Sequence, residues 1–224
     1  MTSIAIIAFD GVTDIDVFLH WDILNRPKTM FDTAPAPADG GGGEAEAAPG
    51  GEPDEEETEA PKGRDWSVSI LGTRPRHVTL AGYDLHPHGS IESARDMDAV
   101  VVASGPLTRE LMHDAEFLSR LLLDPEDQLV AAQCSGALIL GGAGLLAGLE
   151  ATTYPSAREA LEGTGAIVTD KPFVAHDRIA TAAGCLAGIE LDRWLISKLI
   201  DPETADKCVA SAQGWGSGIE ALYG

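Results

Sequence analysis

The stretch LVAAQCSGALILGGAGLL, residues 129–146, decides how the rest of the chain is interpreted. It opens with four apolar residues and a glutamine, a pattern typical of a short strand buried in a parallel sheet. The residues after Cys134 are small or aliphatic, and they predict a helix that packs closely on that strand. Cys134 is therefore expected on a sharp strand-to-helix turn, the arrangement called a nucleophile elbow.

A cysteine at such a turn is well placed to react. Its side chain is held clear of the backbone, the next helix N-terminus favours negative charge, and nearby amides can bind an oxyanion. In that setting the pKa of the thiol is expected to fall to about 4 to 7, which makes it a nucleophile at neutral pH. The alternative is a buried structural cysteine, because small residues after a strand also suit close packing.

Strands and helices alternate on both sides of this turn. Strands are expected at 3–9, 66–72, 98–105, 129–133 and 151–154, and in three more segments between residues 165 and 184. Later helices are expected at 108–122, 135–148 and 186–199. This alternation predicts the α/β class, with a mainly parallel sheet covered on both faces and ligands at the carboxyl ends of its strands.

The first helix follows the turn Asp10-Gly11. Thr13 or Asp14 can cap it, and Arg26-Pro27 is expected to end it. Its apolar face is assigned to residues at helical spacing, namely Ile15, Phe18, Leu19, Ile23 and Leu24.

Residues 29–64 differ sharply from the rest, being rich in Ala, Pro, Gly and Glu. Such a composition buries too little apolar surface to offset its ordering entropy, so we predict a disordered acidic insertion. The remainder of 1–224 is expected to form a single domain, given its length.

The net charge of −21 is not confined to this segment. Residues 39–60 hold nine carboxylates and no base, which leaves −12 for the other residues. An acidic surface argues against nucleic acid and anionic membranes as partners, since both require basic patches. It also favours a halophilic protein, with an acidic mesophilic protein as the alternative.

A soluble cytoplasmic protein with free thiols is expected. No run approaches the roughly 18 apolar residues of a membrane span, and the N-terminus lacks signal-peptide features. The three cysteines, at 134, 185 and 208, have no metal-ligand spacing, and an odd number argues against a disulfide framework. The glycine runs match no nucleotide-binding pattern, so neither a metal nor a cofactor is predicted.

The blocks VVVASGPLTRELM, QCSGALILGGAGLLAG, TTYPSAREAL and IATAAGCLAGIEL resemble, in order and spacing, those of the ThiJ/PfpI family. The likeness covers nearly all of the chain outside residues 29–64. It implies a flavodoxin-like three-layer sandwich of the class I glutamine amidotransferase type, often found as a homodimer. Members include isonitrile hydratases, glyoxalase-type enzymes, peptidases, stress proteins and sensor domains of regulators.

The resemblance also implies roles for particular residues. The nucleophile falls on Cys134, the oxyanion donors on the amides of Gly105 and Ser135, and the acidic partner on Asp16, with Asp14 as the competing candidate. Ser135 stands where peptidase-like members carry a histidine, which argues against a protease. The isonitrile hydratase branch has a hydroxyl residue there, but its Thr-His-Trp block reads Thr-Tyr-Pro at 153–155 here.

Other residues have weaker assignments. Tyr154 can supply a phenol to a substrate pocket or form a structural corner, and His20, one turn after Asp16, can face substrate or solvent. Cys185 is either a close-packed residue or a redox partner of Cys134. No role is assigned to Cys208, and His176 is expected in a surface hairpin turn.

Two functions follow from these residues. The first is a cofactor-free enzyme in which Cys134 attacks a small electrophile, for hydration or hydrolysis of the isonitrile hydratase or glyoxalase kind. The alternative is a non-enzymatic stress or redox-sensing protein in which Cys134 is oxidised.

Overall fold

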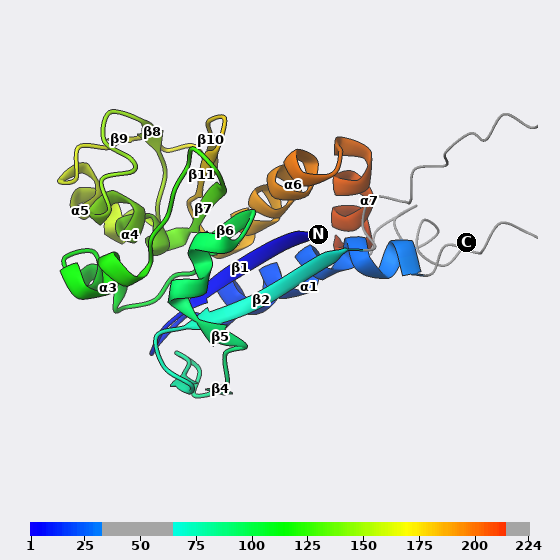
Figure 1. The fold of residues 1–224 in the computed structure, drawn as a ribbon. Coiled ribbons are helices and arrows are strands. Elements are labelled where there is room, and N and C mark those ends of the chain that lie inside the picture. The colour runs from blue at the N-terminus through cyan, green and yellow to red at the C-terminus, as the bar shows by residue number, and fades with distance from the viewer. Residues whose placement is uncertain (33–64, 214–224) are drawn as a thin grey trace, which may run out of the picture.

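A seven-stranded sheet forms the centre of the computed structural model, which describes residues 1–32 and 65–213 (Figure 1). Its strand order is β10-β11-β7-β6-β1-β2-β5, and only the edge pair β10 and β11 is antiparallel. The strands are β1 (Thr2–Ala8), β2 (Trp66–Gly72), β5 (Gly89–Ser90), β6 (Ala99–Val102), β7 (Leu129–Gln133), β10 (Phe173–Ala175) and β11 (Ile179–Ala182). The apolar runs of β1, β6 and β7 are buried because helices cover both faces.

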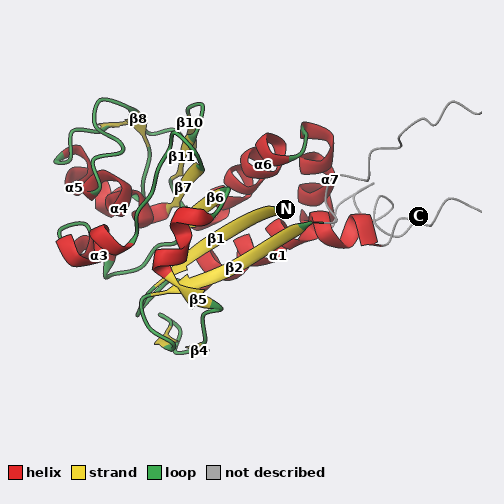
Figure 2. Ribbon diagram, viewed as in Figure 1, coloured by secondary structure: helices red, strands yellow, loops and turns green. Residues whose placement is uncertain are grey.

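The helices form two layers (Figure 2). Three of them pack together beside β1, β2 and β11: α1 (Asp14–Asp32), α6 (Gly188–Leu199) and α7 (Pro202–Gln213). The shorter α2 (Thr108–Leu111), α3 (Ala115–Arg120), α4 (Ala137–Gly142) and α5 (Arg158–Glu162) lie in the other layer, and α4 and α6 flank β7 from opposite sides. This is the predicted α/β sandwich with a mainly parallel sheet.

Short elements connect these layers. Two small ladders lie outside the main sheet: β3 (His77–Val78) with β4 (Asp84–Leu85), and β8 (Glu150–Ala151) with β9 (Ile167–Val168). The 3₁₀ segments are η1 (Ile91–Asp96), η2 (Cys134–Gly136), η3 (Pro155–Ala157) and η4 (Cys185–Ala187). Among the described residues, no helix is long and apolar enough to cross a membrane.

Several predicted elements have different bounds. The helix expected at 108–122 is divided into α2 and α3 because the Asp114 carboxylate accepts the amides of Glu116 and Phe117 and caps a new helix. The helix expected at 135–148 is reduced to α4, beyond which Gly144 has a φ of +78°. Only β8 represents the strand expected at 151–154, and α7 was not predicted.

The first helix departs from its prediction in two ways. Pro27 lies inside α1, which continues to Asp32, because the Arg26 side chain bonds Ser211 of α7 and tertiary packing outweighs the proline. The predicted face is also wrong in part, since Ile15 and Phe18 are 40% and 37% exposed. The buried stripe instead includes Asp16, Val17, His20, Ile23 and Leu24.

The predicted acidic insertion begins too early at residue 29, because residues 29–32 are helical. The rest of that prediction, residues 33–64, lies outside the described residues.

Candidate active site

Cys134 occupies the turn between β7 and α4, as predicted. Its φ of +55° is the only positive value at a non-glycine position in the described chain, a conformation that costs free energy for an L-residue. The Thr153 hydroxyl donates a 2.8 Å hydrogen bond to the Cys134 carbonyl and fixes the turn. The sequence therefore folds into a strained strand-to-helix turn that carries a thiol.

The end of the neighbouring strand β6 packs directly on this turn. The Gly105 amide donates to Ser135 Oγ at 3.4 Å, and Thr108 Oγ1 donates to the same oxygen at 3.0 Å. The Ser135 hydroxyl thus joins two strand ends. The backbone amide of Ser135 is directed at the Cys134 thiol and favours the thiolate. The two amides predicted as oxyanion donors thus lie at adjacent strand ends, with that of Gly105 bonded to Ser135 Oγ and that of Ser135 directed at the Cys134 sulfur.

Asp16 completes the site from the first turn of α1. It is fully buried, and its Oδ2 accepts a 2.5 Å hydrogen bond from Ser104 Oγ. One carboxylate oxygen of Asp16 and the sulfurs of Cys134 and Cys185 all lie within 4.8 Å of one another. The competing candidate, Asp14, bonds Thr79 Oγ1 and the Ala81 amide instead. The structure therefore brings Asp16 to the thiol and directs Asp14 away from it.

The predicted lowering of the thiol pKa is wrong. Burial raises the pKa of Cys134, and the negative charge of Asp16 raises it further, while the Ser104 hydroxyl and the Ser135 amide oppose these effects. Only 6% of Cys134 is exposed, so the thiolate loses most of its hydration. The sequence located the turn correctly but could not show how deeply the sulfur is buried.

We expect the alkylation rate of Cys134 by iodoacetamide to keep rising with pH above the ordinary pKa of a cysteine. The reason is that only the thiolate reacts and its formation is delayed by burial. Peptide mass spectrometry measures the alkylation of Cys134 separately from that of the other two cysteines. A rate that already reaches its plateau near neutral pH contradicts this expectation.

A buried pair lies behind the site, between α1 and α6. His20 Nδ1 donates to Asp192 Oδ1 at 2.6 Å, and both side chains are fully buried. Burial opposes charge on His20, but the carboxylates of Asp192 and Asp16 raise its pKa overall. Burial also raises the pKa of Asp192, against the effect of His20. The predicted substrate-binding role of His20 is not supported, because the ring is enclosed and bonded to Asp192.

Gln133, the last residue of β7, joins this polar region. Its Nε2 donates to the Gly184 carbonyl, and a Cβ at Gly188 would lie 3.0 Å from both Gln133 Oε1 and His20 Cε1. Four buried polar atoms here have no hydrogen-bond partner: Asp16 Oδ1, His20 Nε2, Gln133 Oε1 and Asp192 Oδ2. Neither Gln133 nor Asp192 was predicted. The available signal was an acidic residue within the apolar stripe that α6 buries.

Replacing Asp192 with Leu is expected to destabilise the protein by about 3 to 5 kcal/mol, because it leaves His20 buried without its partner. Adding His20→Phe should recover part of this loss. Since the folded-state pKa of His20 is raised, its contribution is complete below its unfolded pKa and is lost as pH rises through the folded value. The advantage of the wild type over the double variant, measured by urea unfolding, should therefore shrink as the pH rises above the unfolded-state pKa of 6.5.

An Asp22→Asn variant is the matched control, since this exposed residue of α1 pairs only with Arg26 among the ion pairs described. It should change stability by less than about 1 kcal/mol. An advantage of the wild type that grows with pH would contradict the assignment of His20.

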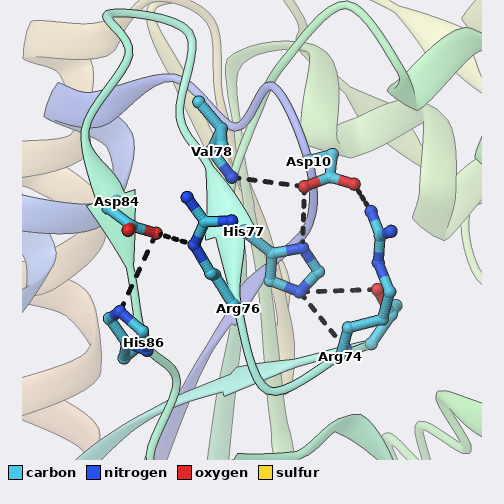
Figure 3. Close-up of polar contacts among 8 residues, drawn as sticks. Asp10, Arg74, Arg76, His77, Val78, Asp84 and His86 are labelled. Carbon is cyan, nitrogen blue, oxygen red and sulfur yellow. Dashed lines mark hydrogen bonds and ion pairs between the residues drawn. The ribbon is translucent and has the colours of Figure 1, made fainter.

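The loop that leads into α1 is held by Asp10 (Figure 3). Its Oδ1 accepts from His77 Nδ1 at 3.1 Å and from the Val78 amide at 3.2 Å, and its other oxygen pairs with Arg74. Burial and the Arg74 charge lower the pKa of His77. Asp10 thereby ties the end of β1 to β3, which positions the first turn of α1 and with it Asp16.

In the described part of the chain, the remaining predicted residues make no side-chain hydrogen bond to this cluster, although Tyr154 directly follows Thr153, which bonds the Cys134 carbonyl. Tyr154 is 47% exposed, and its carbonyl closes the turn into η3, as a structural corner would. His176 lies in the hairpin between β10 and β11, as predicted. Cys208, predicted to follow the last helix, is instead buried within α7, where burial raises its pKa to about 12.

The geometry defines an α/β protein with a buried thiol and carboxylate at the carboxyl edge of a parallel sheet. The family model described as the DJ-1/PfpI family matches residues 2–198, and the chain belongs to this family. The predicted ThiJ/PfpI resemblance is therefore confirmed.

Curated relatives include an isonitrile hydratase from Pseudomonas putida, 31% identical over 129 residues, which are 57% of either chain. Protein DJ-1 homolog A from Arabidopsis thaliana is 34% identical over 113 residues, 49% of this chain and 29% of its own. The matches thus span little more than half of the first relative and less than a third of the second.

Solved structures share the fold across the chain. A ThiJ/PfpI family protein from Pseudomonas syringae is 24% identical with a TM-score of 0.70, covering 96% of this chain and 76% of its own. Schizosaccharomyces pombe DJ-1 is 14% identical with a TM-score of 0.67, covering 96% and 100%. At these identities the likeness concerns the fold alone.

Proposed function

We propose that this protein is a cysteine-dependent, cofactor-free enzyme that adds water to a small electrophile, with an isonitrile as the first candidate. The observation that carries the proposal is the placement of the Asp16 carboxylate beside Cys134 on its strained turn. The substrate class is suggested by the relative named isonitrile hydratase.

The proposed reaction begins with transfer of the thiol proton to Asp16. The sulfur then attacks the terminal carbon of the isonitrile, a carbon–sulfur bond forms, and Asp16 returns the proton to complete a thioimidate. Water next attacks the same carbon, and Asp16 accepts a proton from it and passes that proton to the imine nitrogen. Collapse of the tetrahedral adduct breaks the carbon–sulfur bond and releases an N-substituted formamide and the thiol.

The raised pKa of Cys134 is compatible with this sequence. A thiol that stays protonated until substrate binds needs an adjacent base, and the Asp16 carboxylate is the base that the fold supplies. The Ser135 amide, directed at the sulfur, can stabilise charge as the bond forms.

The experiment is turnover of a small panel of isonitriles, with formamide detected by mass spectrometry. The wild type should convert at least one isonitrile, and Cys134→Ala should not. Cys208→Ala serves as the matched control, because this cysteine lies on α7 away from the site and should leave turnover in place. Equal turnover by wild type and Cys134→Ala rules the mechanism out.

We propose further that two copies associate through an apolar patch on α1 and the β3–β4 ladder. Its exposed side chains are Ile15, Phe18, Val78, Leu80 and Tyr83. The Phe18 and Tyr83 rings meet edge to face at 5.5 Å, so the patch is continuous across the two elements. Light scattering should give twice the chain mass for the wild type and the chain mass for Phe18→Glu. Leu122→Glu, at another exposed apolar residue, is the control and should remain dimeric.

A further inference from the structure

Cys185 is a second thiol beside Cys134 that the hydration reaction does not use. It opens η4, three residues after Ala182, and Ala182 is the partner of Gln133 in the parallel pair β11 and β7. The two cysteines therefore follow the carboxyl ends of adjacent strands. Their sulfurs lie within 4.8 Å of each other.

The two thiols differ in burial and in the interactions that shift their pKa. Cys134 is held on a buried turn, whereas residues 183–187 include no buried residue and Leu186 is 70% exposed. Burial and its contacts with Asp16 and Cys134 raise the pKa of Cys185 to about 12, while its thiol favours the charged form of Cys134.

We infer that Cys185 is a resolving cysteine that forms a reversible disulfide with Cys134 after peroxide has oxidised Cys134 to a sulfenic acid. This inference concerns the same sulfur as the proposed hydratase but does not rest on that activity. It assigns to Asp16 a second proton-transfer function, between the two thiols.

The steps balance with hydrogen peroxide as the oxidant. The Cys134 thiolate attacks one peroxide oxygen, the oxygen–oxygen bond breaks, hydroxide leaves, and the sulfur is oxidised by two electrons. Asp16 then takes the Cys185 proton as that sulfur attacks the Cys134 sulfur. The sulfur–oxygen bond breaks, the proton passes to the departing hydroxide, and a disulfide and water remain.

The test treats the reduced full-length chain with peroxide, then unfolds it in urea so that N-ethylmaleimide blocks every free thiol, including the buried Cys208, and measures intact mass and peptides. The wild type should become lighter by two hydrogens, keep one blocked thiol at Cys208, and give a peptide that joins 134 to 185. Dithiothreitol added before the blocking step should instead leave all three thiols free to be blocked. Wild-type peptide mapping decides this without relying on a variant.

Cys185→Ser should instead accumulate Cys134 carrying two added oxygens, a sulfinic acid that dithiothreitol does not reverse. Cys208→Ser should still form the disulfide. The inference is overturned if wild type and Cys185→Ser give the same sulfinic product, or if Cys208 is the partner. A third outcome would also overturn it, namely zinc bound by Asp16 and both thiols. In that case the thiols would resist peroxide until a chelator is added, and the chain would lose no hydrogens. Failure of isonitrile turnover leaves this result unaffected.

Discussion

Asp16→Asn is expected to lower kcat/KM for the hydrated substrate by about 100-fold to 10,000-fold, the range typical of losing a general acid and base. The same change removes the negative charge that raises the pKa of Cys134, so its alkylation at neutral pH should become faster. Unfolding would also expose the buried Cys134 thiol, so Asp16→Asn must keep a cooperative urea unfolding transition for the two effects to be assigned to the lost carboxylate. Steady-state kinetics and iodoacetamide labelling measure the two effects separately.

Asp14→Asn is the matched control for this prediction. It lies two residues away on the same helix, but its carboxylate bonds Thr79 and Ala81 rather than the site. Its turnover and labelling rate should stay near those of the wild type. If Asp16→Asn kept full turnover, the proposed proton transfers would need another base.

Gly136→Ala should destabilise the fold by about 1 to 3 kcal/mol or more, the cost of overpacking a closed interior. A Cβ at this position would lie 2.7 Å from the Ala103 carbonyl oxygen and closer still to that of Val102, and backbone atoms cannot move aside as a side chain can. Because Gly136 belongs to the same 3₁₀ turn as Cys134, the thiol should be displaced and turnover reduced as well. Urea unfolding measures the stability change.

The control for this substitution is Gly184→Ala. Its φ of −129° suits any residue, and a Cβ there meets no atom within 4 Å. Its unfolding midpoint should match that of the wild type within error. A midpoint for Gly136→Ala equal to that of the control would show that the turn has more room than the structure indicates.

The sheet and the cysteine turn were predictable because their signal is local. Buried parallel strands are near-continuous apolar runs, and those of β1, β2 and β7 are bounded by polar residues or glycines. The small residues after Cys134 likewise reflect a close approach between η2 and the end of β6. Sequence alone therefore located the sulfur.

The buried face of α1 was harder to predict for a physical reason. A search for apolar periodicity assumes that polar residues face water, yet Asp16 and His20 occupy the buried stripe and Ile15 and Phe18 face outward. The polar partners that make this burial tolerable, Ser104 and Asp192, come from distant segments. Pairings of this kind depend on tertiary structure, as does the burial that raises the Cys134 pKa.

Two differences in helix number have separate causes. Helix α7 has an alanine-rich sequence of low overall hydrophobicity, and it is helical because it packs on α1 and α6. Asp114 divides the predicted 108–122 helix through a local cap that apolar periodicity does not detect.

The strained backbone at Cys134 limits its sulfur to a single degree of freedom. With φ held at +55° and the carbonyl bonded to Thr153, the sulfur moves only by rotation about the Cα–Cβ bond, among a small set of staggered positions. Bonding to a substrate carbon, as proposed, and bonding to Cys185 would then compete for one sulfur of restricted position. A disulfide with Cys185 would switch off the proposed hydration by occupying the sulfur itself.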